Sequence, residues 1–112
     1  MDVKGWNYKG FEIEESLKPG ADKFQYFFRV KKTGAKKCTY CIWITDDIIN
    51  IKSKKASKSE QFEDVTRSNR ETWVNWVKSK IDQGVLGDLA LKIDATGENE
   101  IKLSELGEKV EF

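Results

Sequence analysis

Apolar and polar side chains alternate along three segments in the first half of the chain, as they do in strands with one buried face. The three segments are residues 11–17, 24–32 and 36–45. Turn-forming residues separate them, namely Pro19 with Gly20 and then Thr33 with Gly34. Because short turns join antiparallel neighbours, the pattern predicts an antiparallel three-stranded meander.

Each strand of this meander presents two faces, since successive side chains point to opposite sides of a sheet. The larger apolar set falls on one face and comprises Phe11, Ile13, Phe24, Tyr26, Phe28, Val30, Tyr40, Ile42 and Ile44. The other face then carries Phe27, Arg29, Lys31, Cys41 and Trp43. We expect the first face to pack against a helix, because a wide apolar surface needs a second layer.

An amphipathic helix follows a Lys/Ser-rich connection at residues 52–59. Two Ser-x-x-Glu capping boxes, at Ser57 and Ser68, place its start near residue 58 or near residue 69. The helical period aligns Trp73, Val74, Val77 and Ile81 in one apolar stripe, and Gly84 is placed to end the helix. We expect that stripe to pack on the sheet.

The acidic tail, residues 85–112, contains a further alternating pattern. Its apolar positions are Leu89, Leu91, Ile93, Ile101 and Leu103, with a polar loop between the two halves. This pattern predicts a C-terminal β-hairpin. The sequence as a whole predicts one α+β domain over residues 1–112, in which a β-β-β-α core carries that added hairpin.

The missing residues and motifs argue against several classes of protein. The chain has no histidine, the side chain that most often acts as an acid or base near neutral pH. Phosphate-binding loops and the nucleophile elbow are also absent from the sequence. We therefore expect a non-enzymatic protein without a cofactor. No apolar run approaches the roughly 20 residues of a membrane span, and no secretory leader is evident, so a cytoplasmic location is expected.

Charge is distributed unevenly although the net charge is only +1. Residues 1–56 carry 12 basic and 7 acidic side chains, whereas residues 57–112 carry 8 and 12. The basic half could attract phosphate groups. Alternatively, the acidic tail folds against the basic sheet and neutralises it. Both interpretations remain open at the level of sequence.

The candidate binding surface is the sheet face that bears Phe27, Arg29, Lys31 and Trp43, extended by Lys36 and Lys37 at the turn. An open face of this kind could stack aromatic rings on nucleic-acid bases while its cations hold phosphate. Alternatively, the C-terminal hairpin covers the face, or two copies pair there as a homodimer. We expect a macromolecular partner, protein rather than nucleic acid, because a net charge of +1 is low for a nucleic-acid domain.

Two further patterns could hold a metal. Cys38 and Cys41 form a lone Cys-x-x-Cys, but a strand would place the two thiols on opposite faces, so we expect free thiols. Residues 94–105 resemble an EF-hand calcium loop, with its ligand positions at Asp94, Thr96, Glu98 and Glu105. The required Gly is replaced by Asn99. Calcium binding is thus a less favoured alternative than nucleic-acid binding, and no metal is expected.

Overall fold

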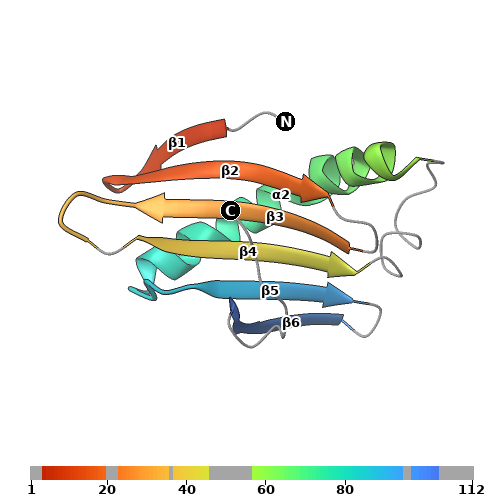
Figure 1. Ribbon diagram of the computed structural model, residues 1–112. Coiled ribbons are helices and arrows are strands. Elements are labelled where there is room, and N and C mark those ends of the chain that lie inside the picture. Colours follow the sequence, from red (N-terminus) through yellow and green to blue (C-terminus); the bar gives the residue numbers. More distant parts are fainter. Residues whose placement is uncertain (1–3, 20–22, 36, 46–56, 95–96, 104–112) are drawn as a thin grey trace.

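One six-stranded sheet and one long helix make up the described part of the chain (Figure 1). The computed structural model describes residues 4–19, 23–35, 37–45, 57–94 and 97–103. Its elements are β1 (Lys4–Tyr8), β2 (Phe11–Pro19), β3 (Lys23–Lys31), β4 (Cys38–Thr45), α2 (Lys58–Asp82), β5 (Leu89–Asp94) and β6 (Gly97–Lys102). The α+β class is confirmed, but the layout of the sheet differs from the predicted one in two respects.

The first difference is an additional strand at the start of the described chain. β1 pairs antiparallel with β2, with Tyr8 opposite Phe11, so that only Lys9 and Gly10 form the turn. Both turn residues have positive φ, 49° for Lys9 and 85° for Gly10. This is the backbone of the two-residue turn whose twist suits a β-hairpin. β1 to β4 therefore form an antiparallel meander of four strands.

The second difference is the position of the C-terminal hairpin. β5 pairs with β4 in parallel, with Leu91 opposite Ile42, and β6 pairs antiparallel with β5. The hairpin thus extends the sheet in its own plane and does not lie across the other strands (Figure 1). The expectation that Leu89, Leu91 and Ile93 cover the outer sheet face is wrong, because all three side chains pack into the cluster beneath the helix.

The main core lies between α2 and the sheet face predicted to meet it. Ile13, Phe24, Tyr26, Phe28, Val30, Tyr40, Ile42 and Ile44 from the sheet are buried there with Phe62, Val65, Trp73, Val77 and Ile81 from the helix. Aromatic rings dominate the contact, with centroids 4.8 Å apart for Phe24 and Phe62, and 5.5 Å apart for Tyr26 and Trp73. The predicted orientation of the strands is confirmed.

The helix begins at the earlier of its two predicted starts. Ser57 is the N-cap, and its hydroxyl accepts a hydrogen bond from the backbone N–H of Glu60 at 3.2 Å. Ser68 lies inside the helix, so its capping-box spacing is coincidental. Gly84 follows the C-cap with φ of 73°, as predicted. Most of the Lys/Ser-rich connection, residues 52–56, lies outside the described residues.

Candidate functional site

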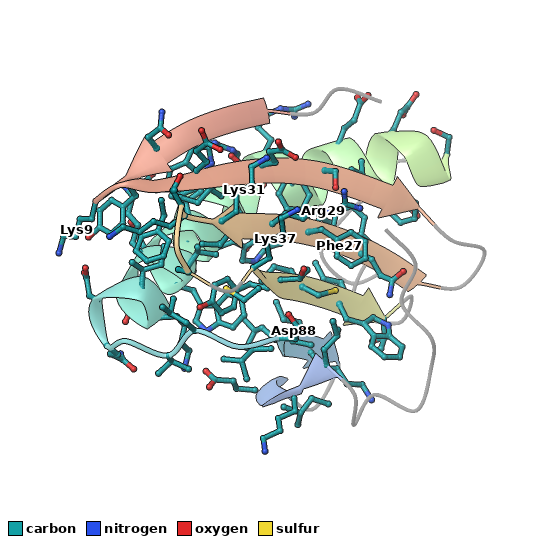
Figure 2. The ribbon with its side chains drawn as sticks, turned by 60° about the vertical axis from the view of Figure 1, so that its left-hand side comes forward. Lys9, Phe27, Arg29, Lys31, Lys37 and Asp88 are labelled. Atoms are coloured by element: carbon teal, nitrogen blue, oxygen red, sulfur yellow. The ribbon has the colours of Figure 1, made fainter. Side chains whose placement is uncertain are left out.

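The outer face, defined as the side of the sheet opposite α2, carries the residues singled out from the sequence. Figure 2 shows Lys31, Arg29 and Phe27 in succession along β3. The register places Phe27 opposite Cys41, and Arg29 opposite Glu14 on one side and Thr39 on the other. Lys36 lies outside the described residues, whereas Lys37 is exposed beside the start of β4. The outer face therefore has an apolar half around Phe27 and a charged half around Lys31.

The apolar half is a small second core. We call it the outer cluster, and it consists of Phe27, Cys41, Trp43, Ala90 and Leu103. The exposed fraction is only 2% for Phe27 and 7% for Trp43. The interpretation in which both rings face solvent is therefore wrong, since buried rings offer no surface on which a base could stack. Of the expected hairpin contacts, Leu103 does reach this face.

The charged half mixes acids with bases. The Lys31 ammonium lies 3.4 Å from a carboxylate oxygen of Glu14 and 3.9 Å from one of Glu12. All three side chains are substantially exposed, so these ion pairs contribute little to stability. Their effect is on the surface potential, because two carboxylates of β2 offset the positive charge of β3. The outer face is not a uniformly basic strip.

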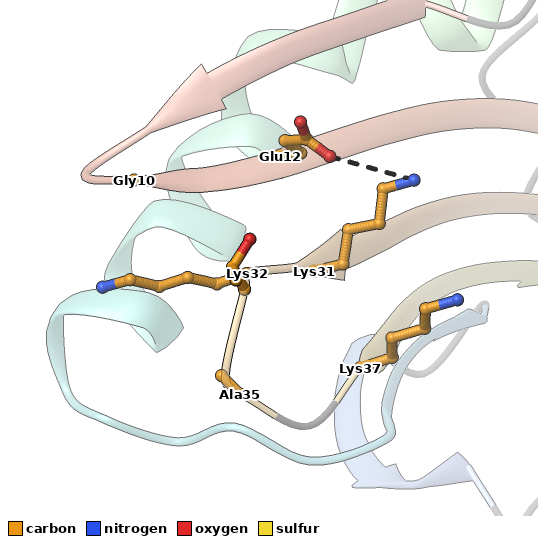
Figure 3. A pocket seen from close by; sticks show the side chains of 7 residues that line it. Gly10, Glu12, Lys31, Lys32, Ala35 and Lys37 are labelled. Carbon is orange, nitrogen blue, oxygen red and sulfur yellow. Dashed lines mark ion pairs between the residues drawn. The ribbon is translucent and has the colours of Figure 1, made fainter.

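A depression of about 270 Å³ opens at the end of the charged half, beside the turn between β3 and β4. Its lining residues are Gly10, Glu12, Lys31, Lys32, Thr33, Ala35 and Lys37. Figure 3 shows that the Lys32 side chain extends in the opposite direction from those of Lys31 and Lys37. The Lys32 ammonium lies 5.0 Å from the centre of the Phe11 ring. The three ammonium groups therefore do not converge on one anion.

The two cysteines lie on opposite faces of β4. Cys38 belongs to the main core and Cys41 to the outer cluster, and both are buried free thiols, as predicted. Burial raises the pKa of Cys41 to about 12 and also raises the pKa of Cys38. Buried thiols of high pKa are poor nucleophiles and poor metal ligands at neutral pH. The pair therefore has none of the properties of a redox or zinc motif.

The segment that resembles a calcium loop is part of a β-hairpin. An EF-hand needs a helix before its first ligand, but Asp94 ends strand β5, and Glu98 lies in β6 opposite Ile93. Thr96 and Glu105 lie outside the described residues. Within the described ranges, no group of three or more acidic, Cys or His side chains is placed to hold a metal ion.

Between the sheet and α2 lies a buried polar network that the sequence analysis did not predict. The Glu15 carboxylate accepts hydrogen bonds from Trp6 Nε1 and Tyr26 Oη, both at 2.7 Å, and from Arg70 through Nε at 2.8 Å and Nη2. Burial and the neighbouring carboxylate raise the pKa of Tyr26 well above its usual range. The hydrogen bonds that Arg70 donates to Glu15 raise the pKa of Arg70. The sequence did contain a signal for the buried position of Glu15, because Glu15 lies between Ile13 and Leu17 and alternate residues of a strand share one face.

Comparison with known proteins adds no further information. No family model matches the chain, and no curated protein or solved structure matches it. Among the described residues, no helix is both long enough and apolar enough to cross a bilayer.

Proposed function

We propose that this chain is a small non-enzymatic binding module that engages a macromolecular partner through the outer face of its sheet. The partner is a protein rather than a nucleic acid. The observation that carries the proposal is the interleaving of Lys31 with Glu12 and Glu14 beside the outer cluster. The rim of a protein interface is typically polar and solvent-accessible, as these exposed ion pairs are.

The same arrangement argues against the nucleic-acid alternative. Phosphate binding depends on cations whose charge is not already offset, and Glu14 lies 3.4 Å from the Lys31 ammonium. Stacking on bases needs accessible rings, and Phe27 and Trp43 are buried. Arg29, Lys31 and Lys37 are the rim residues that we assign to the partner, with Lys36 as a further candidate from the sequence.

The chemistry of the chain supports a non-enzymatic module in a reducing compartment. The sequence contains no histidine, and both thiols are held at raised pKa by burial. Neither thiol is thereby activated as a nucleophile. Unpaired cysteines are usual in the cytoplasm, where thiols are kept reduced. We accordingly propose a cytoplasmic location.

Site-specific photocrosslinking in the native cell tests this proposal. A photoreactive residue replaces Lys37 on the outer face, and a matched control carries it at Arg67, an exposed position of α2. We expect protein adducts from position 37 that are absent from position 67 and are lost when Arg29→Glu and Lys31→Glu are added. Adducts that nuclease removes and that decline steeply with salt would favour the nucleic-acid alternative. The same adducts from both positions would refute the assigned surface.

A further inference from the structure

β1 and β6 are the two edge strands of the described sheet, and β1 is the less protected of them (Figure 1). An exposed edge strand invites pairing with another chain unless charged residues or Pro interrupt it. β6 carries Glu98, Glu100 and Lys102. In β1, by contrast, the residues between Lys4 and Lys9 are uncharged and include no Pro. Among the described strands, β1 therefore offers the edge better suited to accept a further strand.

The turn after β1 determines which of its backbone groups face outward. In a two-residue turn, the C=O of the residue before it accepts a hydrogen bond from the N–H of the residue after it, so Tyr8 and Phe11 form a hydrogen-bonded pair. Hydrogen-bonded and non-hydrogen-bonded pairs alternate along an antiparallel ladder. Trp6 therefore bonds to β2, whereas the N–H and C=O groups of Gly5 and Asn7 point away from β2. A strand that pairs with this edge would bond to those groups.

The outer face beside β1 favours a basic partner. Gly5 and Asn7 lie opposite Glu14 and Glu12, so all four residues share the outer face. The side chains of Glu12 and Glu14 are 66% and 43% exposed, which leaves both carboxylates accessible to a further cation. A Cβ placed on Gly5 would meet nothing within 4 Å, so the path across β1 to Glu14 is open. An added strand would lie two strand spacings from β2, about 10 Å, and a Lys or Arg side chain can bridge this distance by extending toward the carboxylate.

The helix face of β1 favours apolar side chains instead. Trp6 and Tyr8 are half-buried on this face, where both pack against the main core. The Lys78 ammonium of α2 lies 5.7 Å from the centre of the Trp6 ring and 5.4 Å from that of the Tyr8 ring. Repulsion from this ammonium disfavours a basic side chain here, whereas the two rings offer apolar contact to a neighbouring strand.

We propose that β1 accepts an extended segment of a protein partner as a further strand, in which basic side chains alternate with apolar ones. The basic side chains extend over Gly5 and Asn7 toward Glu14 and Glu12, and the apolar ones lie beside Trp6. In this mode of recognition, backbone hydrogen bonds provide the affinity and alternate side chains provide the specificity. None of the rim residues assigned above takes part, so this inference does not rest on the proposed function.

Amide hydrogen exchange measured by NMR tests the proposal at single residues. In the free protein, the N–H groups of Gly5 and Asn7 should exchange much faster than that of Trp6, because only Trp6 is bonded to β2. The probe is the synthetic peptide KVRVKVR, titrated to millimolar concentration, and the control is its acidic counterpart EVDVEVD. We expect the basic peptide to slow exchange at Gly5 and Asn7 several-fold and to shift their amide signals. The acidic peptide should do neither.

Two substitutions of one residue separate the role of the backbone from that of the side chain. Asn7→Pro removes the outward N–H, and an edge strand tolerates Pro where the N–H faces solvent. Asn7→Ala keeps the N–H and is the matched control. We expect peptide binding, measured from the amide shifts, to be lost in Asn7→Pro and retained in Asn7→Ala. Glu12→Gln combined with Glu14→Gln should weaken binding roughly fivefold, and this variant decides the matter even if Asn7→Pro does not fold.

Four results would overturn the proposal. Slow exchange at Gly5 and Asn7 in the free protein would mean that the edge is already paired, either within the chain or, if dilution restores fast exchange, with a second copy. Absence of any effect of KVRVKVR would exclude the added strand. Equal effects of the two peptides would exclude the chemistry assigned to the partner. Shifts confined to the surroundings of Lys37 would place the peptide on the outer face. None of these measurements requires the native partner, so failure of the photocrosslinking experiment would leave this inference intact.

Discussion

Glu15 and Arg70 form a bidentate ion pair beneath the sheet, although 55 residues separate them along the chain. The Glu15 side chain is fully buried, whereas that of Arg70 is 38% exposed. Trp6 and Tyr26 donate the other two hydrogen bonds to the carboxylate. The pair therefore connects β1, β2 and β3 to the middle of α2 through one buried charge.

Removing Arg70 should destabilise the protein more than removing any exposed charge of the helix. Arg70→Ala leaves the Glu15 carboxylate buried without its counterion, which should lower the free energy of unfolding by about 3 kcal/mol. Arg67→Ala is the control, since the Arg67 side chain is 72% exposed and pairs with Asp64 at 3.6 Å. We expect a change within about 0.5 kcal/mol for the control. Urea unfolding followed by circular dichroism measures both, and equal effects would contradict the role assigned to Arg70.

The N-cap of α2 can be tested against the alternative capping box. Ser57→Ala removes the acceptor for the backbone N–H of Glu60 and should cost about 1 kcal/mol of stability. Ser68→Ala replaces an exposed residue inside the helix by a better helix former and should be neutral or stabilising by roughly 0.5 kcal/mol. Thermal unfolding of the two variants distinguishes them. The opposite ranking would move the start of the helix to residue 69.

The turn between β1 and β2 should depend on its glycine. Gly10→Ala forces a side chain into φ of 85°, with its Cβ 3.4 Å from Lys32 Cε, and should cost about 1 kcal/mol. Gly5→Ala is the matched control in β1, where an added Cβ meets nothing within 4 Å. Because alanine restricts the unfolded chain more than glycine, this variant should stabilise the protein by roughly 0.5 kcal/mol. Chemical denaturation measures the change in the free energy of unfolding for both variants. A Gly10→Ala variant as stable as the wild type would be inconsistent with the turn.

Acid should weaken the contact between α2 and β6. A hydrogen bond from Lys80, with a second one from Trp76, lowers the pKa of Glu100 below its ordinary value of 4.5. Because the carboxyl is more acidic in the folded state, its stabilising contribution is present above pH 4.5 and is lost as the pH falls through the lowered value. Stability measured by urea unfolding from neutral to acidic pH should therefore decline less steeply in Glu100→Gln than in the wild type. Identical profiles for the two proteins would exclude the contribution of Glu100.

The strand faces could be predicted because burial imposes a period of two. Phe28 and Ile42 are correctly placed against the helix, and Phe27 and Trp43 on the outer side, from alternation alone. The helical stripe of Trp73 and Val77 follows from its own period in the same way. Local periodicity therefore determined which side of each element faces the core.

The arrangement of the elements could not be predicted in the same way. The alternation of Leu89, Leu91 and Ile93 suits a hairpin lying over the sheet or one lying beside it, since both bury the same side chains. The structure places the hairpin beside β4, where its backbone completes the ladder of an otherwise unpaired edge. Likewise, Arg70 is too distant in sequence from Glu15 to be identified as its partner from local pattern.

The parallel pairing of β4 with β5 determines the order in which the strands of the sheet can pair. β1 to β4 can assemble from consecutive hairpins, but β4 gains its second neighbour only from a strand that follows the 25-residue helix. During synthesis, the edge of β4 that carries Ile42 therefore lacks a hydrogen-bonding partner until β5, with Leu91, has been synthesised. Since contacts between distant segments form slowly, this interval is when the newborn chain is most prone to aggregate.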